Sequence, residues 1–200
     1  MKLKADAWVG LGTCYMELGE YRSAIDAYKE SQVYVCIGDD QRKHLSLLSK
    51  LGDLHGKLGE HEEAISYLDQ ALEIERKLEN IDEGDRDREL ETLSLLGSSY
   101  SSRGAHQEAL NTYEKALTIA RQISDKRKEA VLEGFFLINI GKAFFDLHQY
   151  SKSIQSSEQG LALLKPILGD NAQHMQMATK ILHLAKTLRE LELLANAEKI

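Results

Sequence analysis

Apolar residues recur along this chain at spacings of three and four positions, in stretches separated by short polar breaks. The stretch from Ala7 to Ile25, AWVGLGTCYMELGEYRSAI, shows the pattern and breaks at Gly19-Glu20. Spacings of three and four place apolar side chains on one face of an α-helix. The pattern therefore predicts amphipathic helices arranged in pairs, each pair joined by a tight turn.

Glycines within this stretch raise the alternative of a phosphate-binding loop. After Gly10 and Gly12, a dinucleotide fingerprint needs a third glycine where the chain has Tyr15. The nearest match to a P-loop, Gly56-Lys57, is followed by leucine in place of serine or threonine. Neither motif is complete, so the glycines do not predict a nucleotide site.

The opening stretch recurs three more times, as LSKLGDLHGKLGEHEEAI, LSLLGSSYSSRGAHQEAL and LINIGKAFFDLHQYSKSI. The equivalent glycines are Gly12, Gly52, Gly97 and Gly141, at spacings of 40, 45 and 44 residues. Each unit continues into a second helix whose small-residue position holds Ala24, Ala64, Ala109 or Ser153. A glycine inside a helix costs about 1 kcal/mol relative to alanine. Small residues on both helices allow the two backbones to approach closely, and this contact explains why the glycine is tolerated. We predict that these glycines are contact points within helical hairpins.

The residues Trp8, Leu11, Gly12, Tyr15, Ala24 and Tyr28 form the pattern W-x-x-L-G-x-x-Y…A-x-x-x-Y, which resembles the tetratricopeptide repeat (TPR). The family's repeat has about 34 residues and a closing proline. Here the units are longer, with polar connectors such as ENIDEGDRDR and SDKRKE, and they resemble those of Pins-like proteins, tonsoku-like proteins and kinesin light chains. The resemblance implies an all-α fold, a right-handed superhelical stack of antiparallel helical hairpins with about nine helices.

We expect one TPR array, with repeats at about 5–44, 45–89, 90–133 and 134–171 and a partial repeat or capping helix at 172–200. In the last segment, Ala185 takes the glycine position and Leu184 an adjoining core position. That helix either caps the stack or begins a further repeat. We favour a chain that is a piece of a longer protein.

The face of each first helix opposite the core is expected to line the concave surface of the array. In the second unit this face holds Asp53, Gly56 and Lys57, and in the fourth unit it is aromatic. All four phenylalanines lie on the fourth unit's first helix. Either neighbouring helices cover them, or they are anchors for a partner.

The serines of the third unit have two readings as well: a solvated face, or a surface open to a partner backbone or to phosphorylation. We predict that the concave face binds a partner through Phe135, Ile138, Lys142, Phe145, Asp146, Ser98, Ser101, Ser102, Lys186 and Arg189.

Composition excludes several other functions. The net charge of −7 argues against a nucleic-acid surface, which needs clustered Lys and Arg. No apolar run is long enough to span a membrane, and the start Met1-Lys-Leu-Lys lacks a secretory signal, so a cytoplasmic location is expected. The histidines and paired carboxylates form no catalytic or metal constellation, and we expect neither an enzyme nor a cofactor.

These observations favour a non-catalytic protein–protein interaction adaptor or scaffold. Aromatic and basic residues together suit a partner segment that carries an apolar residue flanked by Asp or Glu. The alternative is a structural, self-associating segment of a larger scaffold or homo-oligomer.

Overall fold

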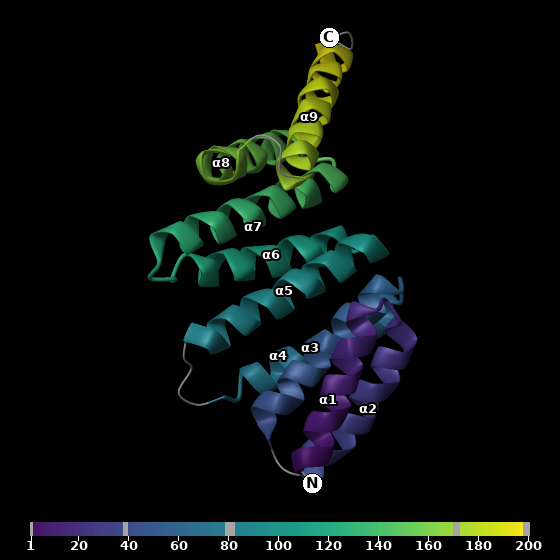
Figure 1. The fold of residues 1–200 in the computed structure, drawn as a ribbon. Coiled ribbons are helices and arrows are strands. Elements are labelled where there is room, and N and C mark those ends of the chain that lie inside the picture. Colours follow the sequence, from purple (N-terminus) through teal and green to yellow (C-terminus); the bar gives the residue numbers. More distant parts are fainter. Residues whose placement is uncertain (1, 38–39, 79–82, 170–172, 198–200) are drawn as a thin grey trace. The chain divides into compact units, whose positions relative to one another are not determined.

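The computed structural model describes residues 2–37, 40–78, 83–169 and 173–197. Within these ranges the chain forms nine helices and no strand (Figure 1), which confirms the predicted all-α fold. The helices are α1 Lys2–Glu17, α2 Tyr21–Ile37, α3 Gln41–Lys57, α4 His61–Glu75, α5 Glu83–Arg103, α6 His106–Ala120, α7 Lys126–Asp146, α8 Tyr150–Leu168 and α9 Gln173–Ala197.

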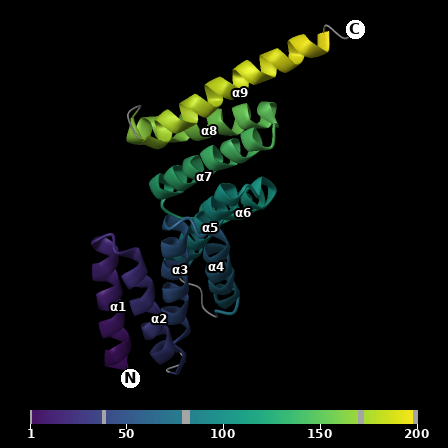
Figure 2. The same cartoon turned by 90° about the vertical axis from the view of Figure 1, so that its right-hand side faces the viewer.

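The helices belong to two compact units, Met1–Arg103 with α1 to α5 and Gly104–Ile200 with α6 to α9. In the first unit α1 packs on α2, α3 packs on α4, and α4 also packs on α5. In the second unit α7 and α8 form a closely packed pair, with α6 against α7 and α9 against both members of the pair. Figure 2 shows α1 to α4 of the first unit side by side from a second direction.

The repeat glycines hold the two helices of a hairpin together. Each faces the large or polar position of the second helix, and the pairs are Gly12 with Tyr28, Gly52 with Leu68 and Gly141 with Ser157. A methyl group added at Gly12 or Gly52 would lie 2.6 Å from a side-chain atom of the opposite residue, well inside van der Waals contact. The predicted role of these glycines as helix contacts is therefore confirmed for these three hairpins.

The α7–α8 pair has a second and closer contact. A methyl group at Gly160 would lie 2.7 Å from the backbone carbonyl oxygen of Gly134. Two glycines thus allow the backbones of the two helices to approach closely. This closeness determines which side of α7 is buried, a point that matters for the predicted site.

The extra length of the units lies largely in their first helices. Helices α5 and α7 have 21 residues each, against 16 in α1 and 17 in α3. They begin at Glu83 and Lys126, inside the polar segments that were expected to be connectors. At α7 the carboxylate of Asp125 accepts hydrogen bonds from the backbone N–H groups of Arg127 and Lys128, at 2.9 and 3.1 Å. Such a cap stabilises the first turn, so part of the connector becomes helix.

Two predicted core positions lie nearer the surface than the repeat pattern indicates. Leu11 on α1 is 39% exposed and Leu184 on α9 is 50% exposed. Helix α1 packs chiefly on α2, and α9 packs along one side on α8 and α7, so each of these two helices keeps one side open. Ala185, by contrast, is fully buried, as its glycine-equivalent position predicts.

Candidate functional site

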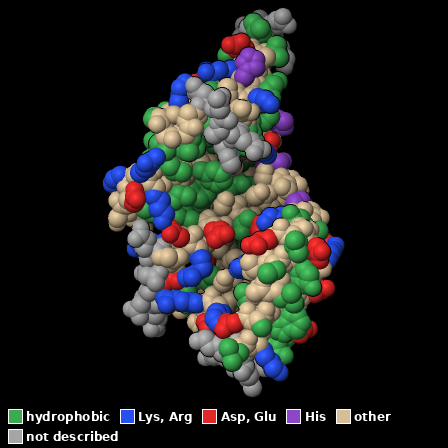
Figure 3. Space-filling view, viewed as in Figure 1, with side chains coloured by type: hydrophobic (Ala, Val, Ile, Leu, Met, Phe, Trp, Pro, Cys, Tyr) green, Lys and Arg blue, Asp and Glu red, His purple; other side chains and the backbone are tan. Residues whose placement is uncertain are grey.

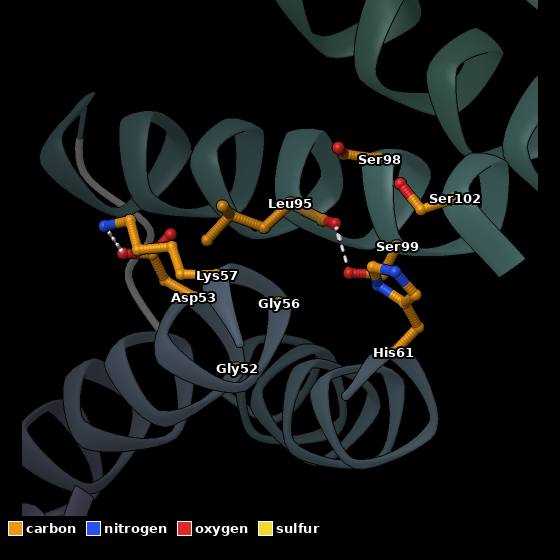
Figure 4. Close-up of a pocket in the computed structure, with 9 residues that line it drawn as sticks. All are labelled: Gly52, Asp53, Gly56, Lys57, His61, Leu95, Ser98, Ser99 and Ser102. Atoms are coloured by element: carbon orange, nitrogen blue, oxygen red, sulfur yellow. Dashed lines mark hydrogen bonds and ion pairs between the residues drawn. The ribbon is translucent and has the colours of Figure 1, made fainter. Parts of the chain in front are cut away.

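A polar seam runs between α3 and α5 in the first unit (Figure 4). Helix α4 packs against both helices, so it holds them side by side and leaves their other face open. This face contains a pocket of about 200 Å³, lined by Gly52, Asp53, Gly56 and Lys57 of α3, His61 of α4, and Leu95, Ser98, Ser99 and Ser102 of α5. The structure thus brings two of the three predicted site serines next to the face of α3 that was expected to be concave.

The absence of a side chain at Gly56 keeps the pocket open. An added methyl group there would have Ser99 Oγ at 3.9 Å and the Cβ of Ala64 at 4.0 Å as its nearest neighbours. These are ordinary contact distances, unlike those at Gly52 one turn earlier. Gly56 therefore has room for a methyl group, whereas Gly52 faces the packed interior of the hairpin.

Hydrogen-bonding groups line the pocket on several sides. The hydroxyl of Ser99 donates to the backbone carbonyl of Leu95 at 2.9 Å. The side chains of Ser98 and Ser102 are exposed and line the pocket with their hydroxyls. The Nδ1 atom of His61 is buried and has no hydrogen-bond partner among the described residues. The pocket therefore offers both donors and acceptors to a ligand.

The two full charges of the pocket neutralise each other. Lys57 Nζ lies 2.5 Å from Asp53 Oδ2, one helical turn away on α3. The ammonium group also lies 6.0 Å from the centre of the Tyr21 ring. Figure 4 shows this ion pair at one end of the pocket and His61 at the other. A ligand in the pocket thus meets no free charge.

A second pocket, of about 170 Å³, continues the seam toward the start of α3. It shares Asp53 and Leu95 with the first pocket and is otherwise lined by Met16, Ser46, Ser49, Lys50, Arg88 and Glu91. Charged groups of both signs are present here. Together the two pockets make a continuous polar strip, which we call the α3–α5 seam.

A buried carboxyl group lies behind the seam, at the end of α4. Glu75 is 7% exposed, and burial together with the nearby carboxylate of Glu89 raises its pKa to about 7. Thr92 donates a hydrogen bond to Glu75 Oε1 at 3.3 Å, while Oε2 has no partner among the described residues. Arg88 lies close enough to oppose the pKa shift, and Asp85 adds to it. This group lies outside both pockets of the seam.

The structure removes Ile138 from the predicted binding surface. Ile138 is 2% exposed and packs against Leu164 of α8 and against Met175 and Ala178 of α9. It lies four residues after Gly134, whose backbone touches α8, and therefore shares that helix face. The predicted orientation was wrong at this residue, because the α7–α8 contact and the cover from α9 bury the stripe on which it lies.

The other predicted residues of α7 keep part of their surface. Phe135, Phe145, Lys142 and Asp146 are all half-buried. Lys142 Nζ lies 2.7 Å from Asp146 Oδ2, and the Phe145 ring centre lies 5.7 Å from that of Tyr150. Figure 3 shows apolar side chains gathered over α7. The aromatic surface is thus partly covered by its own hairpin and partly open.

The remaining predicted residues occupy different environments. Lys186 on α9 pairs with Glu158 on α8 at 2.7 Å, and Arg189 is exposed one turn further along α9. Ser101 is half-buried and does not line the pocket that contains Ser98 and Ser102.

Seven of the nine lining residues were not predicted as site residues. Asp53, Gly56 and Lys57 had been assigned only to the concave face and Gly52 only to a hairpin contact, while Leu95, Ser99 and His61 had been given no place in a site. His61 is the first residue of α4, and the sequence gave no indication that the start of this helix borders a pocket. A search for small residues facing each other on neighbouring first helices would have found Ser99 opposite Gly56.

Other kinds of site were sought in the described part of the chain. No group of three or more His, Cys, Asp or Glu side chains is placed there to hold a metal ion. None of the helices described has both the length and the apolar character that crossing a bilayer requires.

Known structures with the same fold include three that are informative. The match to the apo form of RapI covers 98% of this chain and 52% of the RapI chain, with a TM-score of 0.80 and 17% identity. The match to aspartyl phosphate phosphatase F from Bacillus subtilis covers 94% of this chain and 48% of the phosphatase chain, with a TM-score of 0.74 and 21% identity. The match to NprR in complex with its cognate peptide NprX covers 94% of this chain and 52% of the NprR chain, with a TM-score of 0.62 and 22% identity. The chain thus spans about half the length of these proteins, and the likeness establishes the fold.

No curated protein matches the chain at the level of sequence. The tetratricopeptide repeat family model matches it twice, over residues 3–77 and 44–122. These two matches together extend over more than half of the chain, and the paired helices with their glycine contacts agree with them. The chain therefore belongs to the tetratricopeptide repeat family.

Proposed function

We propose that this protein is a non-catalytic adaptor that binds a segment of a partner protein along the concave face of its helical hairpins. The observation that carries the proposal is the α3–α5 seam, an open strip with two pockets, exposed serine side chains and the unpartnered Nδ1 of His61. Repeat arrays present such faces to extended ligands. NprR, which shares the fold, was solved with a peptide, and this supports a peptide or protein segment as the ligand.

The non-catalytic part of the proposal rests on this chain's own residues, because a protein with the same fold is named a phosphatase. A catalytic acid or base needs a shifted pKa in a group that can reach a substrate. Glu75 has such a pKa but lies buried outside the seam. In the first pocket of the seam, Asp53 and Lys57 are paired with each other. A cytoplasmic location and the aromatic site on α7 stay part of the same proposal.

A display library of natural protein segments tests the proposal directly. The intact chain is immobilised, enriched segments are synthesised, and their binding is mapped by backbone amide NMR shifts. We expect shifts at Gly56, Ser98 and their neighbours on α3 and α5. The substitution Ser98→Arg, which places a large charged side chain in the seam, should abolish binding.

Ser66→Arg is the matched control, because Ser66 is exposed on α4, outside the lining of either pocket. This variant should bind as the wild type does. Failure to enrich any segment, or equal loss of binding in both variants, would contradict the proposal.

A structural, self-associating role is the second candidate, and exposed leucines favour it. Leu3 and Leu11 lie exposed on α1, Leu18 is exposed in the turn that follows it, and α9 exposes Leu184, Leu191, Leu193 and Leu194. Exposed apolar surface of this kind commonly marks an interface. Light scattering coupled to size-exclusion chromatography distinguishes the two roles, since a dimer that dissociates on dilution favours self-association and a monomer at all concentrations excludes it.

A further inference from the structure

The pocket between α3 and α5 has a chemical character that selects among the side chains of a bound segment. We propose that it receives the side-chain amide of an Asn or Gln from the partner. This inference rests on the proposed function, because it assigns one residue of the bound segment to one pocket of the seam.

Size is the first reason. The pocket measures about 200 Å³, and Gly56 contributes no side chain to fill it. The nearest atoms to a methyl group at Gly56 are 3.9 Å and 4.0 Å away, which are ordinary contact distances, so the glycine leaves room for about one further group between α3 and α5. A serine or threonine from the partner would leave much of that volume empty, whereas an amide side chain reaches further into it.

The hydrogen-bonding groups are the second reason. Ser98 and Ser102 carry hydroxyls that both donate and accept, and His61 adds an unpartnered Nδ1 that is buried. A primary amide has two N–H donors and a carbonyl acceptor on one short, planar group, so it can satisfy hydroxyls and a ring nitrogen together. An apolar side chain would cover the same groups and leave them unpaired, which is costly.

Charge is the third reason, and it favours a neutral ligand. Lys57 and Asp53 form an ion pair that stays partly open to solvent, so the pocket presents no net charge. A carboxylate or an ammonium group of the partner would give up hydration without meeting a net opposite charge, which costs free energy. A neutral polar side chain avoids this cost.

The occupant is a chain segment because the seam continues beyond the pocket. The second pocket shares Asp53 and Leu95 with the first and includes Ser49. Ser49 and Gly56 are seven positions apart in α3, which is about 10 Å along the helix axis. An extended peptide covers that distance in roughly three residues. A single short segment therefore reaches both pockets.

The test uses the intact chain and a display library of short random peptides. We expect the enriched peptides to share Asn or Gln at one position. Changing that residue to Asp or Leu in a synthetic peptide should weaken binding about tenfold or more, because the pocket's polar groups are then left unpaired or face a charge. Fluorescence anisotropy measures the change.

Variants of the protein locate the effect. Gly56→Leu fills the pocket and should weaken binding of the enriched peptide about tenfold or more. The double variant Ser98→Ala with Ser102→Ala removes two exposed hydroxyls without crowding, and it should lower the preference for Asn or Gln over Leu. Gly10→Leu is the matched control, since nothing lies within 4 Å of a methyl group at Gly10 on α1. It should bind the peptide normally.

The outcomes separate this inference from the proposed function. Peptides that bind on the seam without an Asn or Gln preference, or that bind Gly56→Leu as tightly as the wild type, overturn the inference and leave seam binding in place. Enrichment of no peptide at all overturns both.

Discussion

Replacing Gly52 or Gly56 of α3 by alanine adds the same methyl group at two positions one helical turn apart. In a helix interior, alanine is favoured over glycine by about 1 kcal/mol. The two positions differ in what the methyl group meets, and Gly56 lies in the last turn of α3. At Gly56 the nearest atoms are at 3.9 and 4.0 Å, so the gain is not offset by a clash and we expect Gly56→Ala to stabilise the protein by up to about 1 kcal/mol.

At Gly52 the methyl group meets the packed interior of the hairpin. It would lie 2.6 Å from Leu68 Cγ and 3.3 Å from the backbone carbonyl oxygen of Ala64. Leu68 is fully buried, so it has no free space into which to move. Overpacking of this kind costs roughly 1–3 kcal/mol, which exceeds the gain from helix propensity. We therefore expect a net loss of about 1 kcal/mol for Gly52→Ala.

Thermal unfolding followed by far-ultraviolet circular dichroism measures both variants against the wild type. A difference of 1 kcal/mol moves the midpoint of a chain of this size by roughly 2–4 °C. The midpoint should rise for Gly56→Ala and fall for Gly52→Ala. If Gly52→Ala is as stable as Gly56→Ala, the glycine is no helix contact. If Gly56→Ala unfolds earlier than the wild type, the space in front of it is not open.

Three further predictions concern buried and half-buried groups. Glu75 has a pKa of about 7 in the folded protein, against an ordinary value of 4.5, so folding takes up a proton between these pH values. The free energy of unfolding should therefore fall as the pH rises through this window, by about 3 kcal/mol at most. Glu75→Gln should flatten this pH dependence and be more stable than the wild type above pH 7. Urea unfolding at several pH values measures this, and a pH profile equal to that of the wild type would refute the role of Glu75. Ile138→Ala should cost about 2–5 kcal/mol in thermal or urea unfolding, because the side chain is buried between three helices; an unchanged stability with lost partner binding would show instead that it contacts the partner. Phe145→Ala should weaken partner binding about tenfold or more with helicity intact, while Val9→Ala on α1 has a much smaller effect; normal binding by Phe145→Ala, or its unfolding, would show that the ring is core packing.

Much of the fold follows from the sequence, because the residues that define each hairpin lie close together in the chain and recur in every repeat. The spacing of Gly12, Gly52 and Gly141 located three hairpin contacts, and the position sixteen residues after each glycine holds the residue that it meets. Each contact is made between helices adjacent in sequence and joined by a tight turn. Such pairs leave little freedom in how the chain returns on itself, so the sequence alone determines which residues meet.

The boundaries of the first helices were harder to infer from sequence. Charged segments such as ENIDEGDRDR read as connectors because their polarity gives no buried face. Polar residues are nevertheless good helix formers, and a cap such as Asp125 starts a helix before the apolar pattern begins. Hydrophobic periodicity marks where a helix is buried, and a helix extends beyond its buried part.

The candidate site depended on tertiary structure. The sequence placed Asp53, Gly56 and Lys57 on one face and Ser98 on another, but each assignment came from a separate helix. Only the packing of α4 against both α3 and α5 decided that these faces border one pocket. In the same way, only the cover from α8 and α9 decided that Ile138 is buried. Periodicity along a helix fixes the direction of a side chain around its own axis, and which of those directions another helix covers depends on the packing of elements distant in sequence.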